Sequence, residues 1–217
     1  MKFLSTLLLG CLCFTAVQAQ KGATKNDPDA KKLLDAVSAK FKTYKSVQSN
    51  FVLKIENAAG KNLGTKAGKV FMKGSKYRIS FPGQEVYSDG SNVWTHDVPS
   101  KEVTITKLDA GSSSITPQKL FTNFYDKDFY YKMNDAEKVG AVMMKVIELT
   151  PTDKTKPFHK VLLYVSNNTI VSTKIYEKTG NRYTYSTSLL KPNLPIAETT
   201  FVFDAKKNPG VEVVDLR

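Results

Sequence analysis

The spacing of apolar residues changes once along the chain. Over residues 28–45 they recur at helical spacing, and Asp27-Pro28-Asp29 supplies a capping carboxylate and a first-turn proline. These features predict one amphipathic helix over residues 28–45. From Ser46 onward apolar and polar residues alternate, and this period of two predicts β-strands for most of the remaining chain.

Turn-forming residues divide this second part into short strands. Gly74-Ser75, Asp89-Gly90 and Asn167-Asn168 are typical of tight turns. A short helix is expected from Ile115-Thr116-Pro117 through about residue 124. A helix followed by many hairpins indicates one α+β, mostly β domain with a barrel-like sheet of about 11–13 strands. The strands are expected at residues 47–57, 63–73, 76–81, 84–88, 92–97, 101–107, 128–134, 140–150, 158–166, 169–177, 182–190, 196–203 and 211–215.

The N-terminal residues predict export. Lys2 precedes an apolar stretch over residues 3–17, and Val17-Gln18-Ala19 suits cleavage by signal peptidase. Residues 1–19 are therefore expected to be a signal peptide, and residues 20–217 a single domain. Leu8-Leu9-Gly10-Cys11 offers a competing interpretation as a lipobox, but the apolar stretch before Cys11 is short for such a signal.

The amino-acid composition limits both the chemistry and the binding partners that are expected of the mature domain. Both cysteines, Cys11 and Cys13, lie in the expected signal, so the mature domain has neither thiolate chemistry nor cysteine metal sites. The net charge is +12, but only three of the 32 basic residues are arginines. Specific readers of bases and phosphates favour the planar arginine fork, so no nucleic-acid partner is expected. The charge suits an anionic lipid surface or an acidic partner, and ordinary solubility explains it equally well.

No motif indicates catalysis. His96 and His159 lie in separate strand-like runs without a partner at metal-ligand spacing. His96 and Asp97 are neighbours on an expected strand, so their side chains point to opposite faces and are unsuited to act as a base and its orienting group. The chain has no nucleophile elbow and no phosphate-binding glycine loop. We therefore expect no enzyme activity, no metal site and no cofactor.

Several segments resemble one protein family. They are the strand pair made by residues 68–73 and 76–79, the segment from Ser88 to Trp94 that contains Asp89-Gly90, and the C-terminal run over residues 200–213. These segments, and the order of signal, helix and strands, are similar to the LolA family, the periplasmic carriers of outer-membrane lipoproteins. The resemblance covers nearly the whole mature chain.

The resemblance implies a fold and a function. LolA-like proteins form an incomplete antiparallel β-barrel, and the N-terminal helix and a short helix cover its concave apolar face. Lipoprotein acyl chains bind in the apolar space beneath the helices. An inner-membrane ABC-type lipoprotein-releasing complex loads the carrier, and an outer-membrane lipoprotein receptor unloads it. By this resemblance we expect a monomeric periplasmic chaperone that ferries lipoproteins from the inner to the outer membrane.

The resemblance also names candidate site residues. Aromatic and aliphatic side chains of the matched strands are expected on the concave face: Phe71, Tyr77, Ile79, Phe81 and Trp94. LolA proteins typically carry Lys-Arg-Pro after the second strand, where the arginine hydrogen-bonds to the lid. This chain has Lys73-Gly74-Ser75 at that place, so Lys73 is the candidate lid latch, without the bidentate fork of arginine.

Three alternatives remain open. A packed core explains the many large apolar side chains without any cavity, and a LolA-like fold also serves carriers or sensors of other lipids. A small outer-membrane β-barrel is the more distant alternative. Lysines in many of the strands, the N-terminal helix and the final Leu216-Arg217 argue against it.

The signal assignment predicts a mature N-terminus at Gln20. Intact-mass measurement of the exported protein, released by osmotic shock, checks this because cleavage after Ala19 fixes the mass of the product. An acylated Cys11 at the N-terminus would instead identify the lipobox as the true signal.

Overall fold

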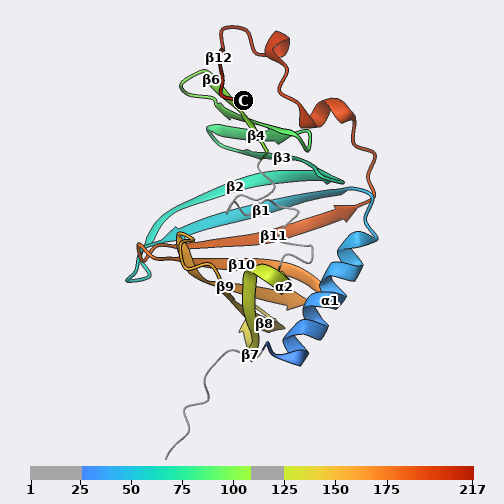
Figure 1. Cartoon of the computed structure of the whole chain (residues 1–217), viewed down its shortest axis with the longest axis vertical. Helices are drawn as coiled ribbons and strands as arrows, with labels where there is room; N and C mark the ends of the chain where they lie inside the picture. The colour runs from blue at the N-terminus through green and yellow to red at the C-terminus, as the bar shows by residue number, and fades with distance from the viewer. Residues whose placement is uncertain (1–25, 109–124) are drawn as a thin grey trace, which may run out of the picture.

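A computed structural model describes residues 26–108 and 125–217 of the chain. Twelve strands in these residues form one sheet, with the helix α1 packed on one side (Figure 1). The expected α+β, mostly β class is confirmed. The elements are α1 (Pro28–Lys42), β1 (Val47–Glu56), β2 (Asn62–Lys73), β3 (Lys76–Phe81), β4 (Gln84–Ser88), β5 (Asn92–Asp97), β6 (Glu102–Lys107), α2 (Tyr125–Asp128), β7 (Phe129–Val139), β8 (Val142–Pro151), β9 (Phe158–Ser166), β10 (Thr169–Glu177), β11 (Arg182–Pro192), the 3₁₀ turns η2 (Glu198–Phe201) and η3 (Ala205–Lys207), and β12 (Glu212–Asp215).

Helix α1 begins where the capping residues predict. The Asp27 carboxylate accepts hydrogen bonds from the backbone N–H groups of Asp29 at 2.8 Å and Ala30 at 3.3 Å, and Pro28 is the first helical residue. The helix ends at Lys42, three residues before the predicted end, and Thr43 caps it. In the described residues no helix is long and apolar enough to cross a membrane.

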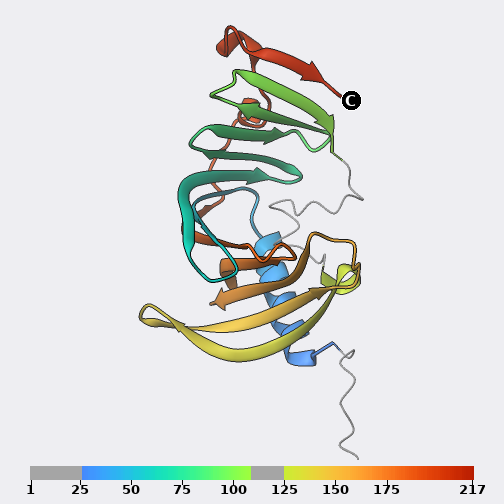
Figure 2. The same cartoon turned by 90° about the vertical axis from the view of Figure 1, so that its left-hand side faces the viewer.

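The sheet is open. Its strand order is β12-β6-β5-β4-β3-β2-β1-β11-β10-β9-β8-β7, so β12 and β7 are its two edges. Neighbouring strands are antiparallel except β12, which pairs in parallel with β6. The sheet curves around α1 (Figure 2), as expected for an incomplete barrel. The predicted Asn167-Asn168 hairpin is confirmed, with φ of 49° and 53°.

The strand expected over residues 196–203 is not formed. Residues 196–203 form the turn η2 and an extended stretch that joins no sheet. Phe201 and Phe203 alternate as they would in a strand, but they bury their side chains against the sheet and are 0% and 8% exposed. The helix expected from Ile115 through about residue 124 lies outside the described residues. Helix α2 begins directly after that stretch, at Tyr125.

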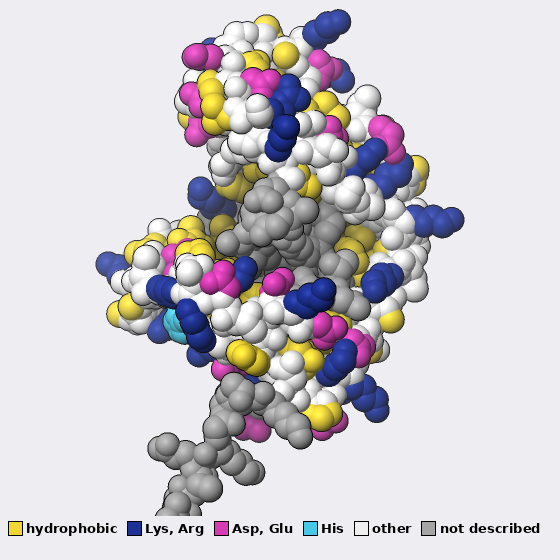
Figure 3. All heavy atoms as spheres, viewed as in Figure 1, with side chains coloured by type: hydrophobic (Ala, Val, Ile, Leu, Met, Phe, Trp, Pro, Cys, Tyr) yellow, Lys and Arg dark blue, Asp and Glu magenta, His cyan; other side chains and the backbone are white. Residues whose placement is uncertain are grey.

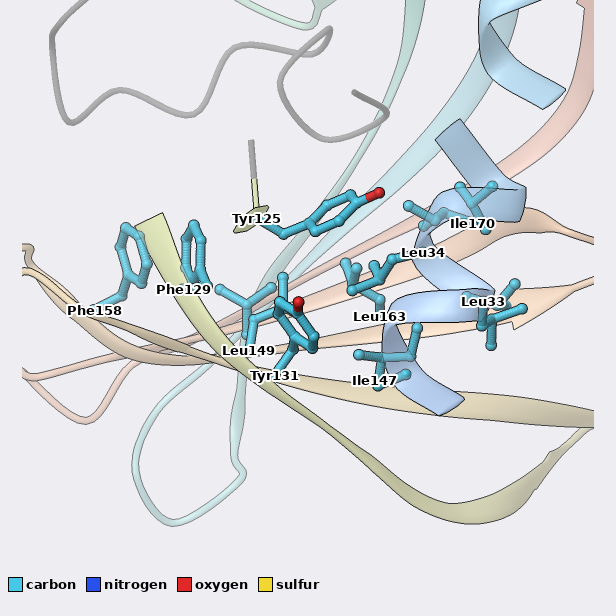
Figure 4. Packing of buried hydrophobic residues seen from close by; sticks show 14 residues of the cluster. Leu33, Leu34, Tyr125, Phe129, Tyr131, Ile147, Leu149, Phe158, Leu163 and Ile170 are labelled. Carbon is cyan, nitrogen blue, oxygen red and sulfur yellow. The ribbon is translucent and has the colours of Figure 1, made fainter. Parts of the chain in front are cut away.

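Cross-strand pairing defines two faces of the sheet, because directly opposed residues point to the same side. The inner face carries Leu53, Tyr185, Thr173 and Leu163, which oppose one another across β1, β11, β10 and β9. Helix α1 packs on this face with Leu33, Leu34 and Val37 (Figure 4). The main core therefore lies between α1 and strands β7 to β10. Its buried members are Ala30, Leu33, Leu34, Val37, Tyr125, Phe129, Tyr131, Ile147, Leu149, Phe158, Val161, Leu163, Val165 and Ile170.

A C-terminal segment, residues 193–211, covers part of the outer face. It leaves β11, passes over β3 and β4 through η2, and returns as β12 (Figure 1). The ring of Phe203 packs there with Tyr87 and Trp94. Lys73 Nζ and Lys76 Nζ approach the Glu198 carboxylate at 2.7 Å and 2.6 Å and bind the segment to the β2–β3 turn.

The two edge strands of the sheet, β7 and β12, differ in how their free backbone is limited. At β7, the Asp27 N–H donates to Tyr131 O at 3.1 Å, and Met133 N–H donates to the Asp27 carboxylate at 3.0 Å. The Asn26 side chain accepts from Tyr131 N–H at 3.2 Å. The backbone of the first half of β7 is thus paired by the residues that precede α1. At the other edge β12 is a strand of four residues with Glu212 and Asp215 at its ends.

Gly68 allows an aromatic ring to lie against β2. Phe51 on β1 is directly opposite Gly68, and a Cβ there would lie 2.6 Å from Phe51 Cζ and 2.6 Å from the Ser80 carbonyl oxygen. The backbone oxygen cannot move without disturbing β3. Only glycine therefore keeps Phe51 in its observed position on the inner face.

We expect Gly68→Ala to destabilise the protein by about 1–3 kcal/mol, because the added methyl group overpacks against Phe51 and the β3 backbone. Denaturant unfolding measures the change. Gly64→Ala is the matched control on the same strand, since a Cβ at Gly64 meets nothing within 4 Å. Equal stability of the two variants would show that the Phe51 ring moves at no cost.

The Glu198 contacts predict a pH dependence. Hydrogen bonds from Lys73 and Lys76 lower the pKa of Glu198 from 4.5 to about 2. A carboxyl group whose pKa is lowered on folding stabilises the fold above its unfolded pKa, and this contribution is lost as the pH falls toward the folded value. Glu198→Gln should therefore be less stable than the parent at neutral pH, and the difference should vanish as the pH falls from 4.5 to about 2.

Denaturant midpoints of the two proteins across this range test the prediction, and the comparison cancels the titration of the other carboxyl groups. Glu212→Gln is the control, because it removes a carboxylate that makes no ion pair among the described residues. A pH-independent difference between Glu198→Gln and the parent would mean that the ion pairs do not hold the C-terminal segment.

Candidate apolar binding cavity

The inner face carries a cavity of about 290 Å³ between its central strands. Strands β1, β2 and β3 form one wall and β10 and β11 the other, so the cavity lies beside the core under α1. Aliphatic and aromatic side chains dominate the lining. The lining residues are Val47, Ser49, Phe51, Leu53, Val70, Met72, Ile79, Phe81, Ile170, Ser172, Thr173, Ile175, Tyr185, Thr187 and Leu190.

Register brings these residues together. On one side of β1, Ser49 opposes Val70, and Val70 opposes Ile79. On the other side, Leu53 opposes Tyr185. Because the side chains alternate along each strand, every second residue of β1 from Val47 to Leu53 reaches the cavity.

Most of the polar side chains that line the cavity form hydrogen bonds with the backbone of the sheet. Ser49 Oγ donates to Ser188 O, Ser172 Oγ to Tyr185 O and Thr187 Oγ1 to Val171 O, each at 3.1 Å. A hydroxyl that already donates to the backbone presents mainly its carbon atoms to a ligand. These three residues therefore leave the cavity apolar in character, which suits a hydrocarbon ligand.

The structure brings three of the five predicted acyl-site residues to the inner face. Ile79 and Phe81 line the cavity. Tyr77 alternates with them on β3 and packs with Val47 and Met72, which are lining residues. A ligand-binding role for the three side chains stays a prediction.

Phe71 and Trp94 lie on the outer face, which corrects their expected placement. Phe71 opposes Arg78, Arg78 opposes Tyr87, and Tyr87 opposes Trp94, so all four share the face opposite Ile79. Trp94 is 9% exposed in the cluster that the C-terminal segment covers. An aromatic residue on a strand is equally suited to either face of a sheet that is covered on both sides, so residue type alone did not distinguish them.

Sequence reasoning missed the β1, β10 and β11 side of the cavity. Phe51, Leu53, Ile175, Tyr185 and Leu190 line it there. The alternating run from Val47 marks the β1 residues as one face. The pairing of β1 with β11, however, joins segments more than a hundred residues apart, and no local pattern indicates it.

Lys73 contacts the C-terminal segment. Its Nζ donates to Ile196 O at 3.2 Å and to the Glu198 carboxylate at 2.7 Å. Lys73 shares the outer face with Phe71, two residues away on β2. Its role as a lid latch stays a prediction, because the expected short helix falls outside the described residues.

Basic side chains are spread over the visible surface and alternate with acidic ones (Figure 3). Tyr176 on β10 is the one described aromatic residue approached by three cations, Lys160, Lys174 and Arg182. Among the described residues no group of three or more histidine, cysteine or acidic side chains is placed to hold a metal ion. The apolar cavity is thus the feature of the described structure best suited to bind a ligand.

Comparison with known proteins agrees with this geometry. An outer-membrane lipoprotein carrier protein from Pseudomonas putida (strain W619) is 26% identical over 215 residues, which cover 97% of this chain and 99% of the relative. An uncharacterised conserved protein from Thermus thermophilus superposes with a TM-score of 0.56 at 12% identity, over 86% of this chain and 99% of that chain. The likeness to the Thermus structure concerns the fold alone.

A LolA superfamily protein from Nitrosomonas europaea superposes with a TM-score of 0.44 at 16% identity, over 80% of this chain and 97% of that chain. The family model described as "Outer membrane lipoprotein carrier protein LolA" matches residues 42–204, from the end of α1 to the C-terminal segment. This match spans most of the chain, including every strand that lines the cavity, and so the chain belongs to the LolA family of outer membrane lipoprotein carrier proteins.

Proposed function

We propose that this protein is a periplasmic carrier that holds the acyl chains of lipoproteins in its inner-face cavity and ferries lipoproteins from the inner to the outer membrane. Membership of the LolA family supports a carrier of lipoproteins in general. The apolar cavity on the inner face is the observation that supports acyl-chain binding. The same proposal includes a signal peptide over residues 1–19 and a single mature domain over residues 20–217.

The length of the cavity suits an acyl chain. From Val47 to Leu53 the lining extends along β1 by six residue-to-residue steps, which is roughly 20 Å at about 3.3 Å per step. One leaflet of a bilayer has a hydrocarbon depth of roughly 15 Å, which its acyl chains span. A chain lying along β1 would therefore fit within the lining.

Hydrocarbon burial supplies the driving force. Each CH₂ group taken out of water contributes about 0.8 kcal/mol, so a lipoprotein chain of about sixteen carbons would cost on the order of 12 kcal/mol to leave exposed. A carrier needs only an apolar surface and a way to release the chain, and it needs no catalytic group. Binding and release are therefore sufficient for the proposed role as a chaperone, and that role requires no enzyme activity.

Loading and unloading need partners at both membranes. We propose an inner-membrane ABC-type lipoprotein-releasing complex as the donor and an outer-membrane lipoprotein receptor as the acceptor, with the carrier acting as a monomer. The net charge of +12 favours encounters with anionic membrane surfaces, although basic residues form no single patch on the face shown in Figure 3.

Ile79→Glu should abolish lipoprotein uptake. The variant places a carboxylate in the apolar wall, where a charged group without a partner costs several kcal/mol beside a bound hydrocarbon chain. The assay measures release of a lipoprotein from inner-membrane vesicles that contain the releasing complex. Thermal unfolding of the variant, measured in parallel, separates loss of binding from loss of the fold.

Val52→Glu is the matched control. Val52 lies on the same sheet but on the outer face, between Phe51 and Leu53, and is 39% exposed. This variant should release lipoprotein as the parent does. A well-folded Ile79→Glu protein with normal release would show that acyl chains bind elsewhere, and loss of release in both variants would point to a general effect of added charge.

A further inference from the structure

Tyr185 differs from the three hydroxyl-bearing lining residues that donate hydrogen bonds to the backbone of the sheet. It lies on β11 opposite Leu53 and Thr173, near the middle of the inner face, and its ring is 6.4 Å from that of Phe51. Ser49, Ser172 and Thr187 each donate to a backbone carbonyl. Within the described residues the Tyr185 hydroxyl makes no hydrogen bond, although it belongs to the cavity lining.

A hydroxyl in such a place needs a partner when a ligand excludes water. A buried donor without an acceptor destabilises the complex, whereas one that meets an acceptor stabilises it. Burial raises the pKa of Tyr185, so the phenol stays protonated and remains a donor. The ligand that suits it carries one acceptor within an otherwise apolar body.

We propose that the Tyr185 hydroxyl donates a hydrogen bond to the carbonyl oxygen of a bound acyl group and so determines the direction in which the chain lies in the cavity. This inference rests on the proposed acyl-chain carrier function. The ligand class is therefore an ester- or amide-linked acyl chain, as opposed to an alkyl chain without a carbonyl. Tyr185 is a specificity-determining residue within the proposed site.

The two ends of the cavity are chemically different, and they assign the direction. At one end Leu190 packs near Phe41, in the last turn of α1, and near Tyr44, which follows the helix, so apolar side chains line that end. Beyond Tyr185 the inner face ends at the turns that follow Glu56 and precede Arg182, where Ala58, Ala59 and Gly60 are exposed to solvent. We place the hydrocarbon tail toward Leu190 and the polar head group toward these exposed turns.

The spacing agrees with this direction. Tyr185 and Leu190 are five residues apart on β11, which corresponds to roughly 16 Å of strand. This length is close to the roughly 15 Å that an acyl chain occupies in one leaflet. A chain whose carbonyl meets Tyr185 would therefore reach the apolar end beside α1.

Two synthetic lipopeptides test the proposal. One carries palmitoyl chains in ester linkage on a glyceryl-cysteine peptide, and the other carries the same chains as hexadecyl ethers, which lack the carbonyl oxygen. Binding of each to the mature protein is measured by displacement of a fluorescent fatty acid. The variant is Tyr185→Phe, and Tyr183→Phe is the control because Tyr183 lies on the same strand and face but outside the cavity lining.

The parent should bind the ester more tightly than the ether by roughly twofold to tenfold, the effect of one hydrogen bond. Tyr185→Phe should lower the affinity for the ester to that for the ether and leave the affinity for the ether unchanged. Tyr183→Phe should keep the parent's preference. The thermal midpoint of Tyr185→Phe should equal that of the parent, since the hydroxyl has no partner among the described residues to lose.

Two results would overturn the inference while leaving the carrier function intact. One is an equal loss of both affinities in Tyr185→Phe, which would make the ring a filler of space. The other is an ester preference that survives the substitution or is missing in the parent. Failure of the parent to bind either lipopeptide would overturn the proposed function itself.

Discussion

The register of β1 against β2 and β11 is the constraint on which the cavity depends. Side chains alternate between the faces of a strand, so a slip of one residue would exchange the two faces. In the observed register Phe51 and Leu53 point inward, and Val52 and Lys54 point outward. Gly68 enforces this arrangement locally, because the position opposite Phe51 has no space for a Cβ atom.

Each face of the single sheet is covered by a different part of the chain. Helix α1 covers the inner face of strands β7 to β10, and the C-terminal segment covers the outer face of β3 to β6. The inner face of the central strands is left to form the cavity. Complete packing by α1 would leave no such space, and part of the apolar inner face is instead left uncovered by the helix.

Much of the fold follows from local patterns in the sequence. The capping residues predicted α1, and alternation with turn residues predicted twelve strands close to those observed. Phe201 and Phe203 were placed wrongly because residues that pack onto a sheet without pairing in it show the same alternation as a strand. Phe71 and Trp94 were assigned to the wrong face because each has an apolar neighbour on the other face, Met72 and Val93, so alternation alone did not decide which of them points inward. Tyr185 was missed because the pairing of β1 with β11 depends on the whole topology.

The two edges of the open sheet are covered in ways that limit pairing with another molecule. An open sheet offers unpaired backbone groups at both ends, which can add strands from another molecule and begin aggregation. Here the residues before α1 occupy the first half of the β7 edge, and β12 ends the other edge as a short strand with acidic residues. The sheet thus stays open and keeps its inner-face cavity, while its edges offer less free backbone for edge-to-edge assembly.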